Sequence, residues 1–226
     1  MLSARPSAPA RWLFSLYLRQ LFRRTFHRIV LRGHFEALKD NEAYPLIFYS
    51  NHQSWWDGLL EWRLVEHLRG DLRLMMAEKN LRQFPFFRRV GVFGVDLEDS
   101  RDRAKGLLHA IKLLRTDTPR RVLVVFPQGE LHPPHEPFHP FLGGLETLLR
   151  KSPQAKAYPL GKVLRFTRYQ RPEVLFQLGK PYSAGATLEE LQAGLQETLQ
   201  PGNPPCKGPE IALLPPHPSD LKRAGT

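Results

Sequence analysis

The sequence predicts an α/β fold: a central, largely parallel or mixed sheet flanked by helices, with an amphipathic helix at the N-terminus. Two observations support this prediction. Short apolar runs alternate along the chain with segments of helical spacing, and such alternation favours a parallel sheet. The 226 residues, of which 42% are hydrophobic and 24% charged, are typical of one globular domain with short appendages.

The elements follow one another in a regular order. Segment 44–50, YPLIFYS, is a continuous apolar run that predicts a strand, and a helix over 54–68 follows it. Further apolar runs predict strands at 72–78 and 91–97. Segment 99–116 has its apolar residues at helical spacing and predicts a second long helix.

The remaining elements complete the alternation. RRVLVVFP, at 120–127, is the clearest strand, because β-branched residues lead directly into a proline. Strands are also expected at 155–166 and 173–182. A helix over 187–200 begins at Thr187 with Glu190 three residues later, which is a capping box. From Pro201 onward the chain is rich in proline and predicts a loose tail or a strap over the body.

The N-terminal segment carries most of the positive charge. The chain has a net charge of 33 − 22 = +11, and residues 1–32 hold seven arginines without an acid or a lysine. Such a basic segment attracts a polyanion, either a lipid surface or a nucleic acid. The apolar run from Trp12 to Leu18 is interrupted by Ser15, ends at Arg19 and is followed by no small-residue cleavage site, so we expect no signal peptide. The run is also far short of the roughly 20 residues of a membrane-spanning helix.

This segment also has an amphipathic pattern. One broad helical face is formed by Leu13, Phe14, Tyr17, Leu18, Leu21, Phe22 and Phe26. The mixture of large apolar residues and arginines favours an interfacial helix on an anionic membrane. The alternative is a helix that packs on the protein's own body, with its arginines in solvent.

Cys206 is the single cysteine, which excludes an internal disulfide and a thiolate zinc site and fits a reducing compartment.

FYSNHQSWWDGLL, at 48–60, is the first segment with candidate chemistry. On one uninterrupted helix His52 and Asp57 would point about 140° apart. They can meet if His52 lies in a strand-to-helix turn and Asp57 in the first helical turn, and the capping residues Ser50, Asn51 and Ser54 support that junction. The carboxylate would then orient the imidazole as a general base. The alternative is a buried histidine packed against two tryptophans.

A second segment, VLVVFPQGE, places Phe126, Pro127, Gln128, Gly129 and Glu130 after another strand, at the same edge of the sheet. NHQSWWD followed about 75 residues later by FPQGE resembles the glycerolipid (lysophospholipid) acyltransferases, whose motifs are NH-x4-D and FPEG. AEKNLRQFPFFRRVGVFGVD (77–96) and AYPLG (157–161) are similar to the family's intermediate and fourth motifs. The likeness covers about residues 35 to 185.

The resemblance implies acyl transfer from an acyl thioester, carried on coenzyme A or acyl carrier protein, to a hydroxyl of a lipid-like acceptor. His52 would be the base and Asp57 its orienter. The substrate-binding candidates are Asn51, Ser54, Lys79, Arg101, Arg103, Phe126, Pro127, Gln128, Gly129 and Glu130. No cofactor and no metal are implied.

The resemblance also sets the expected organisation. We expect a basic membrane-surface helix over 1–34, an acyltransferase domain over 35–200 and a Pro-rich tail over 201–226. The protein is expected to act in lipid metabolism, such as phospholipid biosynthesis, from the cytoplasmic side of a membrane as a peripheral or monotopic protein.

Three positions depart from the family's pattern. Leu97 replaces the arginine that usually follows the aspartate of the second motif, Gln128 replaces glutamate, and Glu130 replaces serine or threonine. Arg101 or Arg103 could supply the missing guanidinium, or both could lie on the outer face of their helix. Because a phosphate monoester requires fixed cationic donors, the acceptor can equally be a glycolipid or another amphiphilic alcohol.

Two functions other than acyl transfer fit parts of the sequence. The same pair could activate water in a thioesterase-like hydrolase, and the high pI allows a nucleic-acid binder, but no nucleic-acid-binding motif is present. His132, His135 and His139 lie close together, but the surrounding prolines prevent a helix that would align them on a metal. An irregular rim over the acceptor pocket is the favoured interpretation of that segment.

Overall fold

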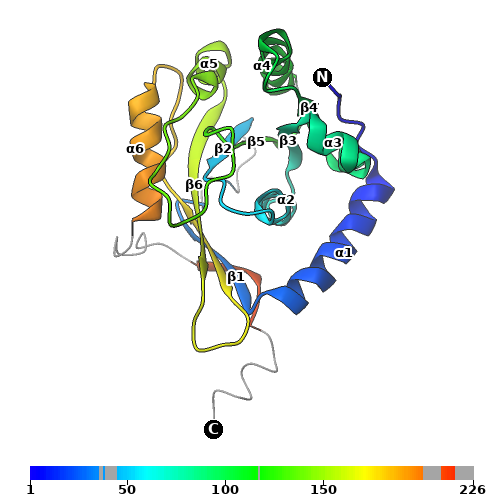
Figure 1. Ribbon diagram of the computed structural model, residues 1–226, viewed down its shortest axis with the longest axis vertical. Helices are drawn as coiled ribbons and strands as arrows, with labels where there is room; N and C mark the ends of the chain where they lie inside the picture. Colours follow the sequence, from blue (N-terminus) through cyan, green and yellow to red (C-terminus); the bar gives the residue numbers. More distant parts are fainter. Residues whose placement is uncertain (36–37, 39–44, 117, 201–209, 217–226) are drawn as a thin grey trace.

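The computed structural model describes residues 1–35, 38, 45–116, 118–200 and 210–216 (Figure 1). Its centre is an eight-stranded sheet in the order β4-β3-β5-β2-β6-β7-β1-β8. The strands are β1 (Arg28–Gly33), β2 (Leu46–Ser50), β3 (Asp71–Ala77), β4 (Val92–Val95), β5 (Arg121–Val125), β6 (Lys156–Arg165), β7 (Glu173–Leu178) and β8 (Glu210–Leu214). The helices are α1 (Ala8–Thr25), α2 (Asp57–His67), α3 (Glu78–Gln83), η3 (Pro85–Val90), α4 (Ser100–Arg115), α5 (Gly144–Lys151) and α6 (Leu188–Leu199).

The sheet is mixed, as predicted. Strands β4, β3, β5, β2 and β6 are parallel to one another, so their carboxyl ends meet at one edge. Strand β7 is antiparallel to β6, β1 is parallel to β7, and β8 is antiparallel to β1. The edge where the five parallel strands end is where an α/β protein of this kind places its site.

Two hydrophobic cores cover the two faces of the sheet. Helices α1 and α2 pack on one face through residues such as Phe22 and Leu60, and α4, α5 and α6 pack on the other. Figure 1 shows α6 and α1 on opposite sides of the sheet. Central strand β2 serves both cores, because Phe48 faces α2 and Tyr49 faces the opposite layer. All five residues of β2 are buried, so the turn that follows it starts from a fixed point.

The strands and helices predicted between residues 44 and 200 are present within a few residues of their expected bounds, including the Thr187–Glu190 capping box. The helix expected over 1–34 is shorter and spans Ala8–Thr25. Strand β1 was missed, because Arg28 and Arg32 made the segment look like a continuation of the basic helix. The helix instead ends at Thr25. Glu173 lies 3.0 Å from Arg28 and Glu210 lies 2.6 Å from Arg32, so neighbouring strands neutralise both arginines.

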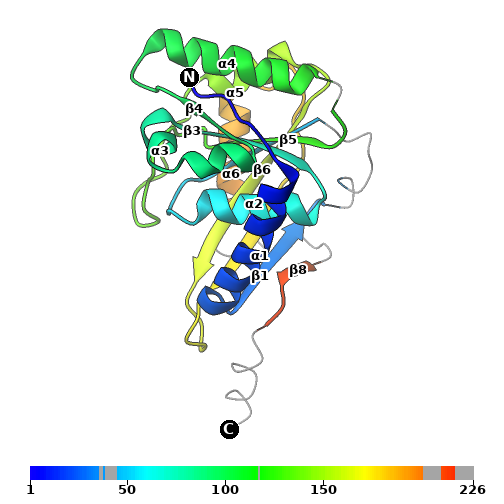
Figure 2. The ribbon, with the colours of Figure 1, turned by 90° about the vertical axis from the view of Figure 1, so that its right-hand side faces the viewer.

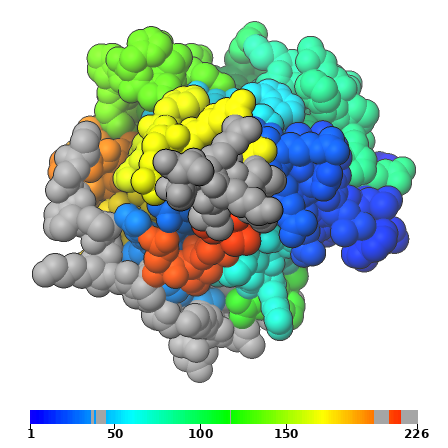
Figure 3. Space-filling view, turned by 90° about the horizontal axis from the view of Figure 1, so that it is seen from below, coloured from blue at the N-terminus to red at the C-terminus, as the bar shows by residue number. Residues whose placement is uncertain are grey.

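Strand β8 was also missed. The segment from Pro201 onward was expected to be a loose tail or a strap, yet Glu210–Leu214 pairs with β1 and buries Leu213 and Leu214 in the core. Figure 2 shows this short strand beside β1, and Figure 3 shows its residues in orange-red on the lower surface. The two segments expected to flank the domain therefore each contribute a strand to its sheet. The rest of 201–226 lies outside the described residues, apart from 215–216.

In helix α1, only part of the apolar face predicted from the sequence is buried. Phe14, Leu18 and Phe22, with Phe26 just beyond the helix, are buried in the core, whereas Leu13 and Tyr17 are exposed. The helix therefore packs on the body and still presents apolar residues to solvent. Among the described helices, none has the length and apolar character needed to cross a membrane.

Candidate active site

A tight turn between β2 and α2 brings His52 and Asp57 together. Strand β2 ends at Ser50, and α2 begins at Asp57. The Asp57 N–H donates to the Ser54 carbonyl oxygen, which closes the turn. His52 Nδ1 then lies 2.8 Å from Asp57 Oδ2. The contact expected from the five-residue spacing is present, and it arises from the strand-to-helix turn that the capping residues predict.

Asp57 is the centre of the hydrogen bonds in this turn. Its Oδ2 accepts from the backbone N–H groups of Gln53 at 2.6 Å and Ser54 at 3.0 Å, and its Oδ1 accepts from Ser54 Oγ at 2.8 Å. Lys162 Nζ lies 3.0 Å from the same Oδ1. The carboxylate is fully buried, so these donors take the place of water.

These contacts fix the charge of Asp57. Burial alone would raise the pKa of its carboxyl group, but the Lys162 ammonium, the hydrogen bond from His52 and the Ser54 N–H together hold that pKa well below the usual range. Asp57 is therefore ionised and can only accept hydrogen bonds. Because it accepts from Nδ1, the neutral imidazole carries its proton there and leaves Nε2 as an acceptor.

Asn51 was expected to bind substrate, but its side chain is buried and occupied. Asn51 Nδ2 donates to the Lys162 carbonyl oxygen at 2.9 Å, and the Lys162 N–H donates to Asn51 Oδ1 at 2.8 Å. The side-chain amide thus makes the same pair of hydrogen bonds that a strand backbone would make, and it extends the pairing of β2 with β6 by one residue. This places the Lys162 side chain beneath the turn that carries His52 and Asp57.

Lys162 and Glu61 complete a buried charged group that sequence reasoning missed. Lys162 Nζ lies 2.8 Å from Glu61 Oε1. Only 3% of the Lys162 side chain and 0% of the Glu61 side chain are exposed. The pKa of Glu61 is raised, since burial disfavours its carboxylate more than Lys162 favours it. Both residues could have been noticed in the sequence. Each is a charged residue at a position where the pattern of the predicted helix or strand would place an apolar one.

The loop after β5 lies against the same turn. The Phe126 ring stacks on the His52 imidazole with the ring centroids 4.4 Å apart and the planes 18° from parallel. Gln128 Oε1 accepts from the His52 N–H at 3.4 Å, and Gln128 Nε2 donates to the His139 carbonyl oxygen at 3.5 Å. The structure therefore brings the two predicted motifs together, with Gln128 linking the loops.

The other residues of this loop have different surroundings. Pro127 is buried, and its carbonyl oxygen accepts from the Leu142 N–H at 2.8 Å. Gly129 has a φ of +80° and its N–H closes a turn on the Phe126 carbonyl oxygen at 3.0 Å, a conformation that favours glycine. The Glu130 side chain is exposed.

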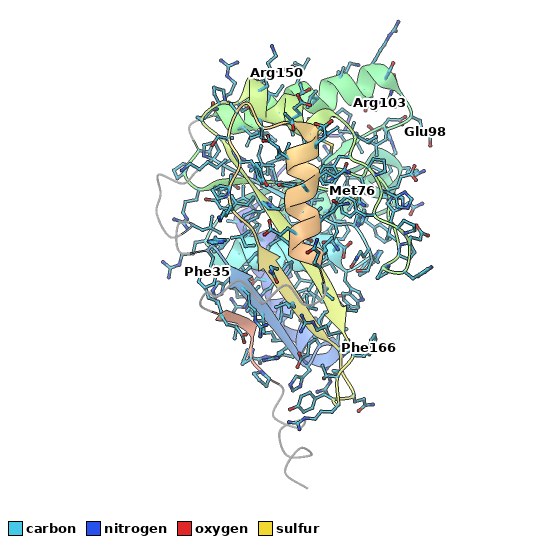
Figure 4. All side chains as sticks on the ribbon, turned by 90° about the vertical axis from the view of Figure 1, so that its left-hand side faces the viewer. Phe35, Met76, Glu98, Arg103, Arg150 and Phe166 are labelled. Carbon is cyan, nitrogen blue, oxygen red and sulfur yellow. The ribbon has the colours of Figure 1, made fainter. Side chains whose placement is uncertain are left out.

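The expected cationic residues lie further out. Lys79 is 75% exposed and faces Glu98 at 3.7 Å, which makes a weak surface contact. Arg101 and Arg103 are exposed on α4, and Arg103 Nη1 donates to the Leu97 carbonyl oxygen at 2.7 Å. Figure 4 shows Glu98 and Met76 on the side of the molecule where the parallel strands end, with Arg103 above them on α4. Arg103 is therefore next to the position where the family has arginine, but it binds the main chain there.

A hollow of about 360 Å³ lies elsewhere, between α1 and the far end of α2 from Asp57. Its lining includes Arg11, Trp12, Arg19 and Glu66. Neither His52 nor Asp57 lines this hollow, so it is separate from the candidate active site.

Comparison with known proteins agrees with the geometry. The family model described as Acyltransferase matches residues 32–162, more than half of the chain, and this range contains His52, Asp57, Phe126–Glu130 and Lys162. No curated protein matches the chain. The chain therefore belongs to the acyltransferase family, the glycerolipid acyltransferases that its NH-x4-D and FPxG motifs resemble.

Proposed function

We propose that this protein transfers a fatty acyl group from an acyl thioester, acyl-coenzyme A or acyl carrier protein, to the hydroxyl of a lipid-like acceptor at a membrane surface. The 2.8 Å contact between His52 Nδ1 and Asp57 Oδ2 carries this proposal. It joins a fully buried carboxylate to an imidazole that keeps 27% of its side-chain surface exposed. The buried carboxylate holds the imidazole in place through Nδ1, and the exposed part of the ring remains accessible to substrate.

The proton path follows from the tautomer. His52 Nε2 removes the proton of the acceptor hydroxyl, and the oxygen attacks the thioester carbonyl carbon. A C–O ester bond forms, the C–S bond breaks, and the leaving thiolate takes the proton back from the imidazolium. The Asp57 carboxylate stabilises the imidazolium that forms between these events. No step requires a metal or an organic cofactor.

The surroundings of the base bear on the acceptor. Leu97 provides no cation, Glu130 adds an exposed acid, and Arg103 is bound to a main-chain carbonyl. Fixed cations are what a phosphate monoester needs. A hydroxyl on a lysophospholipid with a larger head group, on a glycolipid or on another amphiphilic alcohol fits this set of residues.

The exposed face of α1 supports action at a membrane. Near the start of the helix this face is apolar, and we call its residues the α1 patch: Trp12, Leu13, Leu16 and Tyr17, which are between 44% and 63% exposed. One or two turns later the same face carries Arg19, Arg23 and Arg24. Large apolar residues next to arginines suit insertion into the head-group region of an anionic leaflet. The lipid acceptor would then reach His52 from that surface, which we place on the cytoplasmic side.

The proposal is tested by supplying the purified protein with labelled acyl-coenzyme A or acyl carrier protein and a lipid extract in vesicles. The expected result is an acyl-lipid product, identified by mass, that forms only when acceptor is present. His52→Ala should abolish it. His67→Ala is the matched control, because this exposed histidine lies at the opposite end of α2.

Two results would contradict the proposal. Release of free fatty acid at the same rate with and without acceptor would indicate a hydrolase. Product formation by a folded His52→Ala protein at the wild-type rate would remove the imidazole from the mechanism.

A further inference from the structure

The segment 130–142 after the FPQG loop gathers three metal-ligating side chains. The structure gives it no helix or strand, and a turn in which the Glu136 N–H donates to the Pro133 carbonyl oxygen at 3.0 Å reverses the chain. This turn brings Glu136 back toward His132, and His139 then stacks on His132 with ring centroids 3.6 Å apart. His135 is exposed and is not part of this cluster. The prolines prevent a helix, as expected, but a turn achieves the same convergence.

The distances within the cluster suit a small tetrahedral ion. His132 Nδ1 and His139 Nε2 each lie 3.3 Å from Glu136 Oε2, and the three ligand atoms all lie within 4.8 Å of one another. Zn²⁺ binds imidazole nitrogen and carboxylate oxygen at about 2.0–2.2 Å, so two ligands of a tetrahedral site are about 3.3–3.5 Å apart. Two of the three edges already have that length.

One ligand atom is enclosed without a hydrogen bond. His139 Nε2 is inaccessible to solvent, and in the described part of the chain it makes no hydrogen bond; its neighbour is the Glu136 carboxylate at 3.3 Å. Neutral imidazole and ionised carboxylate are the forms that coordinate zinc.

We propose that His132, Glu136 and His139 form a binding site for one divalent transition-metal ion, best suited to Zn²⁺, with water in the fourth position. Coordination tilts one imidazole out of the stack so that both ring nitrogens face the ion. Two nitrogens and one oxygen favour zinc, cobalt or nickel over calcium and magnesium, which prefer oxygen ligands alone.

The site would fix the loop beside the catalytic turn. The His132 N–H donates to the His52 carbonyl oxygen at 2.8 Å, and the His139 carbonyl oxygen accepts from Gln128 Nε2. An ion that holds both histidines therefore ties segment 132–139 to the main chain of His52 and to the FPQG loop. The ion takes no part in the proton transfer proposed above; it stabilises the rim of the site.

The test uses the full chain without an affinity tag, stripped with a chelator and dialysed. Co²⁺ is titrated while its visible absorption is followed, and Zn²⁺ is then added as a competitor. We expect one ion per chain, the intense absorption of four-coordinate Co²⁺, and displacement by Zn²⁺. His132→Ala, His139→Ala and Glu136→Gln should each weaken binding by at least about tenfold to a hundredfold.

His135→Ala is the matched control, because it removes a histidine from the same turn but outside the cluster, and it should bind Co²⁺ like the wild type. His52→Ala should also retain binding, which separates this site from the catalytic imidazole. Zn²⁺ should raise the melting temperature of the wild type and leave that of His139→Ala unchanged. Absence of Co²⁺ binding, equal weakening by His135→Ala, or loss of binding in His52→Ala would overturn the proposal.

Discussion

Removal of Lys162 should show how the turn that carries His52 and Asp57 is held in place. Lys162 Nζ lies 3.0 Å from Asp57 Oδ1 and 2.8 Å from Glu61 Oε1, and all three side chains are buried. Lys162→Met keeps the length of the side chain but leaves two carboxyl groups without their cation. Breaking a buried ion pair from one side costs about 3–5 kcal/mol, and we expect a loss of that size in the free energy of unfolding near neutral pH.

The matched variant is Glu61→Gln. Burial raises the pKa of Glu61, so its negative charge is less favourable there than in water, and glutamine removes that charge with nearly the same shape. Lys162 keeps Asp57 as its partner in this variant. We expect a cost of about 1 kcal/mol, the size of one hydrogen bond.

The pH dependence has a definite sign. Without Lys162 the folded-state pKa values of Asp57 and Glu61 are higher than in the wild type, so these carboxyl groups bind more protons in the folded variant than in the folded wild type. Its stability deficit should therefore shrink as the pH is lowered from 7.5 to 5.5 and grow as the pH rises.

The assay is urea unfolding followed by tryptophan fluorescence at both pH values. An unfolding free energy of Lys162→Met within about 1 kcal/mol of wild type, or a larger cost for Glu61→Gln than for Lys162→Met, would refute the reasoning.

Three further outcomes follow from contacts in the structure. Phe126→Ala removes the ring stacked on His52 and should lower kcat by about tenfold to a hundredfold, because a misplaced base transfers protons poorly; an unchanged kcat in steady-state kinetics would show that stacking does not position the imidazole. Gly33→Ala should cost about 2–5 kcal/mol in urea unfolding, since φ is +111° and a Cβ would lie 2.1 Å from the Leu178 carbonyl oxygen; a cost under about 1 kcal/mol would mean that β1 and β7 separate easily. Replacing Trp12, Leu13 and Tyr17 in the α1 patch by serine should weaken sedimentation with anionic vesicles, whereas Leu108→Ser, an exposed leucine on α4, should not; equal effects would argue against docking through α1.

The sequence predicted the interior of the fold better than its borders. Strands such as β2 and β5 are continuous apolar runs because helices cover both of their faces, so their pattern is unambiguous. Strand β1 carries Arg28 and Arg32, whose partners Glu173 and Glu210 come from neighbouring strands. Strand β8 lies in a segment dominated by proline. Because the acids that neutralise these arginines are distant in the sequence, the local pattern around β1 does not indicate a buried strand.

The same contrast holds at the site. His52 and Asp57 were predictable because five residues and a cap define their geometry locally. Lys162 is separated from Asp57 by more than 100 residues, and the contact depends on the β2–β6 register and on the Asn51 amide. Glu136 was overlooked because its contact with both His132 and His139 depends on the turn at Pro133, which the sequence pattern does not show.

The central claim is that His52 and Asp57 act as one unit, and a double-mutant cycle on the acyl-transfer rate tests it most directly. Asp57→Asn alone should lower kcat by about a thousandfold or more, because asparagine does not stabilise the imidazolium. In the His52→Ala background the same change should have no further effect on the residual rate. If the two losses multiply instead, the aspartate acts independently of the imidazole, and the mechanism derived from their contact is contradicted.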